Sequence, residues 1–235
     1  TRAELRRLGL TTSKGLAYGD AASEILARVQ AEPPPSLVAI RTRPRKGLDR
    51  VLLGSVAERV IRRSPVPVLA IDPAVEETFA FTRILVPLDL HPLSTEVLPA
   101  VLELARIHTS EVVLVHVVPL QPEPFTYREF ELRSPESVEA LLEPHLEPLG
   151  RAGLRARTRI EYGDAAEEIL RAAREESADL VAMTTHGRRG PARWVLGSVA
   201  EDVLRHSPCP LLVVRTAGLA TGPEVVESEA AGIER

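Results

Sequence analysis

Short apolar runs alternate along the chain with longer segments in which apolar residues recur every three or four positions. Short continuous runs of this kind are typical of parallel strands buried on both faces, and the longer segments are typical of amphipathic helices. The alternation predicts an α/β fold, a doubly wound parallel five-stranded sheet with helices on both faces. The predicted strands are residues 83–89, 112–118, 157–162, 180–184 and 211–214.

Polar residues mark where the helices between these strands begin. Ser94 is expected to cap the first helix, where Pro99 lies early enough to predict a kink. A second helix is predicted over residues 136–150. Asp164 is expected to cap the third, with Glu167 completing a capping box. The fourth helix is predicted to begin at Ser198, with Glu201 as its capping-box partner.

An internal repeat organises the chain. Residues 18–22 (YGDAA) recur at 162–166, residues 53–58 (LGSVAE) at 196–201, and residues 64–68 (SPVPV) at 207–211 (SPCPL). The offsets are 144, 143 and 143 residues, so a single small insertion separates the blocks. Three ordered matches at one spacing predict two copies of one domain.

The two copies are unequal. Residues 82–216 carry the pattern of a complete domain, whereas residues 1–72 lack counterparts of its first two strands, with residues 73–81 as a linker. We therefore expect a fragment or the product of a truncated gene. The strand expected near residues 16–18 cannot pair with that near residues 37–40, so the first portion must lean on the second copy. Two complete five-stranded sheets would refute this, and residues 217–235 are predicted to be a mobile tail.

Composition narrows the functional classes. The chain is 44% hydrophobic and 26% charged, with a net charge of −4, which is ordinary for a globular protein and too mild for a nucleic-acid binder. One cysteine, Cys209, excludes an internal disulfide, and no apolar run approaches the length of a membrane span. These features predict a cytoplasmic protein. Residues 1–72 carry a charge of about +6 and the remainder about −10. This difference indicates either that each part has its own solvated surface or that the two parts attract each other electrostatically.

The chemically informative segment runs from Met183 to Gly187 and, nine residues later, reaches Gly197 and Ser198. A buried strand leads through a loop rich in glycine and arginine to a helix start, whose backbone N–H groups and dipole attract anions. Glycine at both ends of the loop lets a phosphate chain approach. The alternative is that the two glycines serve a tight turn and close packing. The loop also holds Arg188, Arg189 and Arg193.

This loop resembles the nucleotide motif of the universal stress protein family: Gly, two residues, Gly, nine residues, then Gly-Ser or Gly-Thr. The sequence matches at Gly187, at the spacing and at Gly197-Ser198, and departs at Thr184, where the motif has its first glycine. The resemblance implies a Rossmann-like fold of the adenine nucleotide alpha hydrolase type, a universal stress protein domain. It also implies that the loop and the helix start hold the phosphates of ATP.

Further matches extend this resemblance. Asp89, after Pro87, corresponds to a family aspartate beside the adenosine portion of the ligand, although a helix cap is the alternative role. Val117 corresponds to a residue whose backbone meets adenine, although it also fits the core. The nucleotide-binding residues implied are Pro87, Asp89, Val117, Met183, Thr184, His186, Gly187, Arg188, Gly197, Ser198 and Val199.

The first copy has lost this motif. Pro44 stands where Gly187 stands in the second copy, and proline fixes φ and removes a donor N–H. Gly54 and Ser55 remain, with Glu58 as the expected capping-box partner, but no nucleotide is expected there. The basic residues Arg41, Arg43, Arg45 and Lys46 are interpreted as a solvated surface rather than an anion site.

No catalytic or metal-ligating set emerges from the sequence. His186 has no acid or nucleophile partner, so it is expected to position the loop, and Cys209 is expected to be a packed thiol. The leading hypothesis is an ATP-binding regulatory module for stress responses, with Mg²⁺ accompanying the nucleotide and at most weak hydrolysis. The second is a nucleotide-free module for dimerisation, in which residues 66–71 and 210–214 pair within one chain or a homodimer forms. An ATP-consuming synthetase is disfavoured because residues 89–93 contain no glycine.

Overall fold

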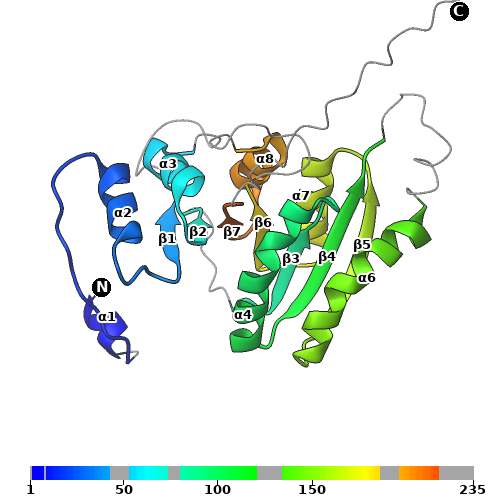
Figure 1. Ribbon diagram of the computed structural model, residues 1–235, viewed down its shortest axis with the longest axis horizontal. Helices are drawn as coiled ribbons and strands as arrows, with labels where there is room; N and C mark the ends of the chain where they lie inside the picture. The colour runs from blue at the N-terminus through cyan, green and yellow to red at the C-terminus, as the bar shows by residue number, and fades with distance from the viewer. Residues whose placement is uncertain are drawn as a thin grey trace, which may run out of the picture.

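The computed structural model describes residues 2–7, 9–42, 53–73, 80–120, 134–185 and 196–216. Within these residues seven strands form one sheet in the order β1-β2-β7-β6-β3-β4-β5 (Figure 1). Its strands are β1 (Val38–Arg41), β2 (Val68–Ile71), β3 (Arg83–Pro87), β4 (Glu111–Val118), β5 (Ala156–Tyr162), β6 (Leu180–Thr184) and β7 (Leu211–Val214). The helices are α1 (Arg2–Arg7), α2 (Ala21–Gln30), α3 (Ser55–Arg63), η1 (Pro92–Val97, a 3₁₀ helix), α4 (Leu98–His108), α6 (Pro135–Arg151), α7 (Ala165–Glu175) and α8 (Ser198–His206).

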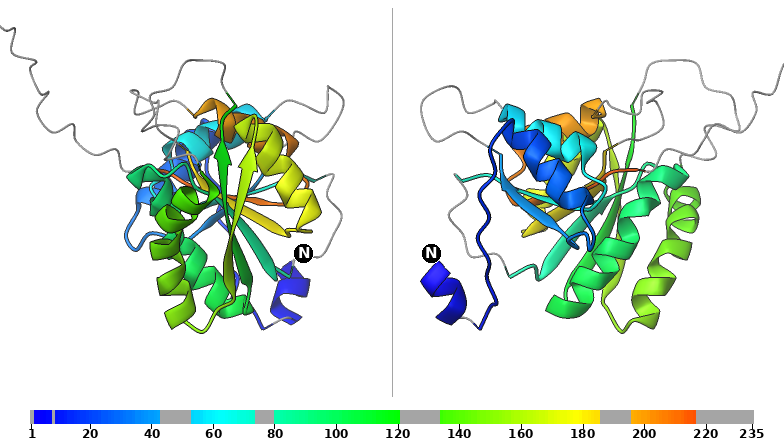
Figure 2. Two further views of the ribbon diagram at one scale, coloured as in Figure 1. Left: turned by 90° about the vertical axis from the view of Figure 1, so that its right-hand side faces the viewer. Right: turned by 60° about the vertical axis from the view of Figure 1, so that its left-hand side comes forward.

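Strands β3 to β7 are parallel and form the doubly wound sheet that the sequence predicted. Alternate residues of each strand face opposite sides. Leu85 and Val181 pack with α7 and α8 on one side, whereas Ile84 and Ala182 pack with η1, α4 and α6 on the other. Figure 2 shows α4 and α6 together on one face of the sheet. The continuous apolar runs are therefore explained by burial on both faces.

The first repeat extends the same sheet and forms no separate one among the described residues. β1 pairs parallel with β2, and β2 runs antiparallel to β7, with Val68 opposite Val213 and Ala70 opposite Leu211. The prediction of a strand near residues 16–18 is wrong. Leu16 and Tyr18 are 78% and 86% exposed and lie outside any strand, because no described strand lies beside them to supply hydrogen bonds.

One expected detail of the first helix of the second repeat is also corrected, and the predicted kink at Pro99 stays a prediction. Ser94 is not the cap. The chain enters η1 through His91, whose Nδ1 accepts from the Leu93 N–H at 3.2 Å, and the Ser94 hydroxyl donates to the His91 carbonyl at 2.8 Å. Pro99 is the second residue of α4, where its missing N–H has no intrahelical partner to lose, and the change of helix type comes just before it.

The predicted cap at Asp164 is confirmed. Its Oδ1 accepts from the N–H groups of Ala166 and Glu167, both at 3.0 Å. Asp20 occupies the same place in the first repeat and accepts from the Ser23 N–H at 3.0 Å. The repeated YGDAA sequence therefore specifies the same helix start in both repeats.

Charged side chains cover β5, the edge strand beyond β4. Arg159 donates to Glu161 at 2.6 Å and to Glu176 at 2.9 Å, and it also pairs with Glu175. Glu111 joins the network through Arg157 at 3.0 Å. Charges along an edge strand discourage another strand from pairing there, so this network protects the edge.

Candidate functional site

The carboxyl ends of β6, β3 and β4 lie side by side, because β3 lies between the other two strands in the sheet. The chain leaves β3 toward η1 on one face and leaves β6 toward α8 on the other. Ligands of open α/β sheets bind outside the carboxyl ends of strands at such a switch point. β3 pairs with β4 up to Pro87 opposite Val115, whereas its recorded pairing with β6 ends at Leu85 opposite Val181.

Buried hydrogen bonds fix the exit from β3. The Leu88 N–H donates to the Val115 carbonyl at 2.9 Å, and the Leu88 carbonyl lies 2.7 Å from Nδ1 of buried His116. Because a carbonyl only accepts, this contact assigns the proton to Nδ1 of His116. Asp89 follows, half-buried, and its Oδ1 accepts from the His91 N–H at 3.0 Å. Sequence reasoning missed the supporting roles of His91 and His116.

Asp89 is not the cap of the following helix, since His91 holds that position. Its carboxylate instead closes a turn of two residues around Leu90, whose φ is +63°. Asp89 is therefore held in place at the end of β3 by its bond to the turn that follows.

Backbone hydrogen bonds fix the chain where it leaves β6. Thr185 N–H donates to the Val214 carbonyl at 3.0 Å, and Gly197 N–H donates to the Thr185 carbonyl at 2.9 Å. The Gly197 bond holds the start of α8 beside the end of β6. The first repeat does the same, with Gly54 N–H donating to Thr42 at 2.7 Å. His186, Gly187 and Arg188 lie outside the described residues, as do Arg43, Pro44, Arg45 and Lys46.

The start of α8 corrects the predicted capping box. The N-cap is Gly197, with φ −62° and ψ 148°, and Ser198 is the first helical residue. Glu201 donates its N–H to the Gly197 carbonyl at 2.8 Å, while its carboxylate pairs with Arg205 at 2.5 Å. Among the described residues no side-chain cap bond is recorded at this helix end. A glycine cap has no side chain to bond the first-turn N–H groups, and the dipole at a helix start favours an anion.

The sequence profile of the universal stress protein family matches this chain over residues 2–72 and 80–215. The chain belongs to the universal stress protein family. The universal stress protein Sll1654 of Synechocystis is 34% identical over 134 residues, which cover 57% of this chain and 85% of that protein. The universal stress protein MJ0531 of Methanocaldococcus jannaschii is 33% identical over 144 residues, covering 57% and 82%.

The solved structures agree on the fold. A universal stress protein from Archaeoglobus fulgidus aligns with a TM-score of 0.66 and 24% identity, over 91% of this chain and 72% of that chain. That alignment extends over both repeats of this universal stress protein, because it covers most of its length. The profile match in two segments agrees with the internal repeat seen in the sequence.

The fold places the described residues of the family motif at one edge of the sheet. Pro87 ends β3, Thr184 ends β6, and Gly197 is bonded beside it through Thr185. Val117 lies near the end of the neighbouring strand β4 and is partly exposed, whereas Met183 is buried in the core. Ser198 and Val199 form the first turn of α8. Thr184, the departure from the motif, is 5% exposed and sits within β6 opposite Val214.

Cys209 is a packed thiol, as predicted. It is buried, and desolvation raises its pKa to about 11 against a weaker opposing hydrogen bond from Ser207. In the described part of the chain no three His, Cys, Asp or Glu side chains gather as metal ligands. The described helices include none with the length and apolar character needed to cross a membrane.

Proposed function

We propose that residues 82–216 bind ATP, or another adenine nucleotide, at the carboxyl edge of β6, β3 and β4. The protein then acts as a cytoplasmic regulatory module of stress responses, with Mg²⁺ accompanying the phosphates. The observation that carries this proposal is the start of α8, where Gly197 provides the cap without a side chain. Family membership supports it, because the nucleotide motif of the family falls on this helix start.

The phosphates would lie against the N–H groups of Ser198 and Val199. A helix start holds about half a positive elementary charge, which favours an anion, and α8 is nine residues long. The bond from Gly197 to Thr185 fixes that start next to the end of β6. The start of α8 would therefore already be in position when a ligand arrives, which lowers the entropic cost of binding.

The nucleoside would lie toward β3 and β4. Asp89 is oriented by the His91 N–H and is suited to accept bonds from ribose hydroxyls, as acidic residues do in other nucleotide-binding sheets. Backbone groups of Val117 would meet adenine. His116 supports both positions, because it holds the Leu88 carbonyl at 2.7 Å and comes from the strand that carries Val117.

Thr184 is compatible with this arrangement. Its side chain is buried within the sheet, and Thr185 next to it is 1% exposed. A buried side chain at this position adds no bulk on the solvent side of the loop entrance. Among the described site residues Asp89 is the one carboxylate, and no nucleophile is paired with a base, so binding rather than turnover is proposed.

Titration of the full chain with fluorescently labelled ATP and Mg²⁺ tests the proposal. Saturable binding is expected, and Asp89→Asn should weaken it about 10- to 100-fold, because a hydrogen bond to a charged group contributes about 1.5–3 kcal/mol. Glu103→Gln is the matched control, since Glu103 lies on α4 away from the site, and it should leave affinity unchanged. Absence of saturable binding with Mg²⁺ present would defeat the proposal.

A second candidate is an interaction module that needs no nucleotide. The antiparallel register of β2 with β7 supports it, since the last strands of the two repeats would then imitate a dimer within one chain. Leu69→Pro in β2 should expose the edge of β7 and raise the association state in sedimentation velocity. Leu16→Pro, in an exposed segment outside any strand, is the control. An unchanged association state would count against this candidate.

A further inference from the structure

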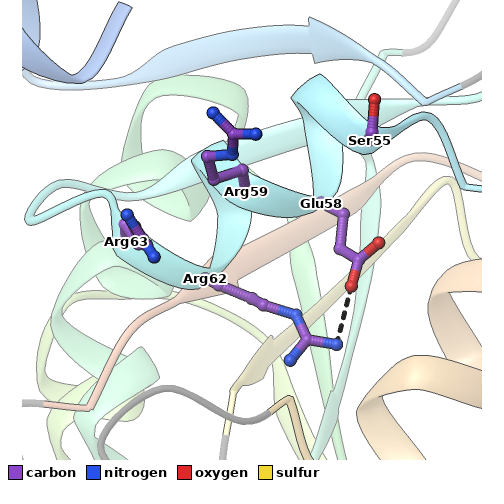
Figure 3. Close-up of a pocket in the computed structure, with 5 residues that line it drawn as sticks. All are labelled: Ser55, Glu58, Arg59, Arg62 and Arg63. Carbon is purple, nitrogen blue, oxygen red and sulfur yellow. Dashed lines mark ion pairs between the residues drawn. The ribbon is translucent and has the colours of Figure 1, made fainter. Parts of the chain in front are cut away.

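The outward face of α3 carries a basic groove. Its lining comes from positions three and four apart on one helix, and together they border an open cavity of about 350 Å³ (Figure 3). Figure 3 shows the Arg62 guanidinium turned toward Glu58, to which it is bonded at 2.7 Å, while Arg59 pairs with Asp20 at the start of α2. We call this lining the α3 groove: Ser55, Glu58, Arg59, Arg62 and Arg63.

The repeat supplies an internal comparison for this surface. The positions of α8 that correspond to Glu58, Arg59, Arg62 and Arg63 hold Glu201, Asp202, Arg205 and His206. Three arginines against one glutamate give the α3 groove a charge of +2, whereas the α8 counterpart has −1 with its histidine neutral. The two helices have the same length and the same glycine cap, so the difference lies in the charges.

The chain leaves the sheet beside this groove. In the antiparallel pair Val68, the first residue of β2, is opposite Val213, so β7 ends beside the start of the strand that follows α3. Residues 217–235 then hold four glutamates, Glu224, Glu227, Glu229 and Glu234, against one arginine, a net charge of −3. Nineteen residues are enough to follow the groove, because even a helical segment of that length would be about 28 Å long, while the groove is about 12 Å long.

We propose that residues 217–235 of the same chain bind in the α3 groove, with their glutamates beside Arg59, Arg62 and Arg63. Opposite charge selects α3 over α8, and the exit point places the segment within reach. Tethering gives the segment an effective concentration in the millimolar range, so weak charge pairs suffice for substantial occupancy. Contacts of this kind are released by salt, because the Debye length falls from about 10 Å at 0.1 M to about 3 Å at 1 M.

Paramagnetic relaxation tests the proposal on the full chain. A nitroxide is attached at Ser228→Cys, with Cys209→Ala so that one thiol remains, and amide peak intensities are compared before and after reduction of the label. The amides of α3 should lose intensity about twofold, as expected for half occupancy, and those of α8 should not. The loss should vanish in 1 M salt.

Two variants control the experiment. Glu224→Gln, Glu227→Gln, Glu229→Gln and Glu234→Gln together neutralise the segment without touching the sheet, and should abolish the loss at α3. Arg59→Asp with Arg63→His gives α3 the residues of α8 and should do the same. Equal losses on both helices, or a loss at α3 that survives neutralisation, would overturn the proposal. So would a loss that appears only when isotope-labelled chains are mixed with separate spin-labelled chains, since the segment would then act between copies.

Discussion

Replacing Gly197 with aspartate should separate nucleotide binding from stability. The backbone there has φ −62° and ψ 148°, close to the values at the two aspartate caps, where φ is −72° and ψ 119° at Asp20 and 130° at Asp164. The new carboxylate can therefore adopt their geometry and accept the first-turn N–H groups of α8. It would occupy the donors that the proposal assigns to phosphate and add a negative charge beside them.

The magnitude follows from the electrostatics. One unit of charge about 5 Å from a phosphate, at an effective dielectric constant of about 20, raises the free energy of binding by about 3 kcal/mol. This corresponds to an affinity for ATP about 100-fold weaker. Aspartate is a slightly better N-cap than glycine, so the free energy of unfolding should rise by a few tenths of a kcal/mol, about 0.3 kcal/mol.

The matched control is Gly54→Asp at the start of α3. Gly54 has φ −65° and ψ 136° and likewise receives no side-chain cap, so the gain in stability should be the same. The affinity for ATP should not change, because no nucleotide is expected in the first repeat. Calorimetric titration with ATP at fixed salt, together with urea unfolding, measures both quantities. If Gly197→Asp binds ATP within about twofold of the wild type, the phosphates do not lie at α8.

Three further outcomes are expected. Leu142→Ala, at a fully buried position of α6, should lower the free energy of unfolding, measured in urea, by about 2–5 kcal/mol. Its neighbour Leu141 is 44% exposed, so Leu141→Ala should change that free energy little. Similar losses in the two variants would mean that α6 does not pack as described. Because burial raises the pKa of Cys209 from 9.0 to about 11, alkylation of the native protein at pH 8 should be about 100-fold slower than in urea, and equal rates would contradict that burial. Bonds from Arg157 and then Arg83 lower the pKa of Glu111 below its ordinary 4.5, so its stabilisation is present above pH 4.5 and is lost as pH falls through the lowered value. Glu111→Gln should therefore flatten the loss of stability below pH 4.5, and an unchanged acid limb would show that Glu111 contributes none of it.

The strands were largely predictable because burial on both faces leaves a continuous apolar run. β6 and β7 begin and end where the sequence indicated, and β3 ends two residues early, at Pro87. The helix start at Asp164 was equally clear. The strand expected near residues 16–18 was not formed, since a strand requires a hydrogen-bonded neighbour and local sequence does not show whether one is present.

The site was less predictable in its details. Ser198 and Glu201 satisfy the capping-box pattern, yet the N-cap is the preceding residue, Gly197, which is bonded to Thr185. This hydrogen bond joins the two ends of a loop, and no periodic pattern in the sequence predicts it. The roles of His91 and His116 likewise depend on which strands become neighbours. The types of residue in the site could therefore be predicted from the sequence, whereas their hydrogen-bond partners could be identified only from the fold.

Backbone amide shifts of the full chain during addition of ATP and Mg²⁺ test the central claim most directly. The account predicts that the amides of Gly197, Ser198 and Val199 move most, together with those around Asp89 and Val117, while Gly54 and Ser55 stay in place. Shifts confined to the first repeat, or the absence of any shift at the start of α8 while ATP binds, would contradict it.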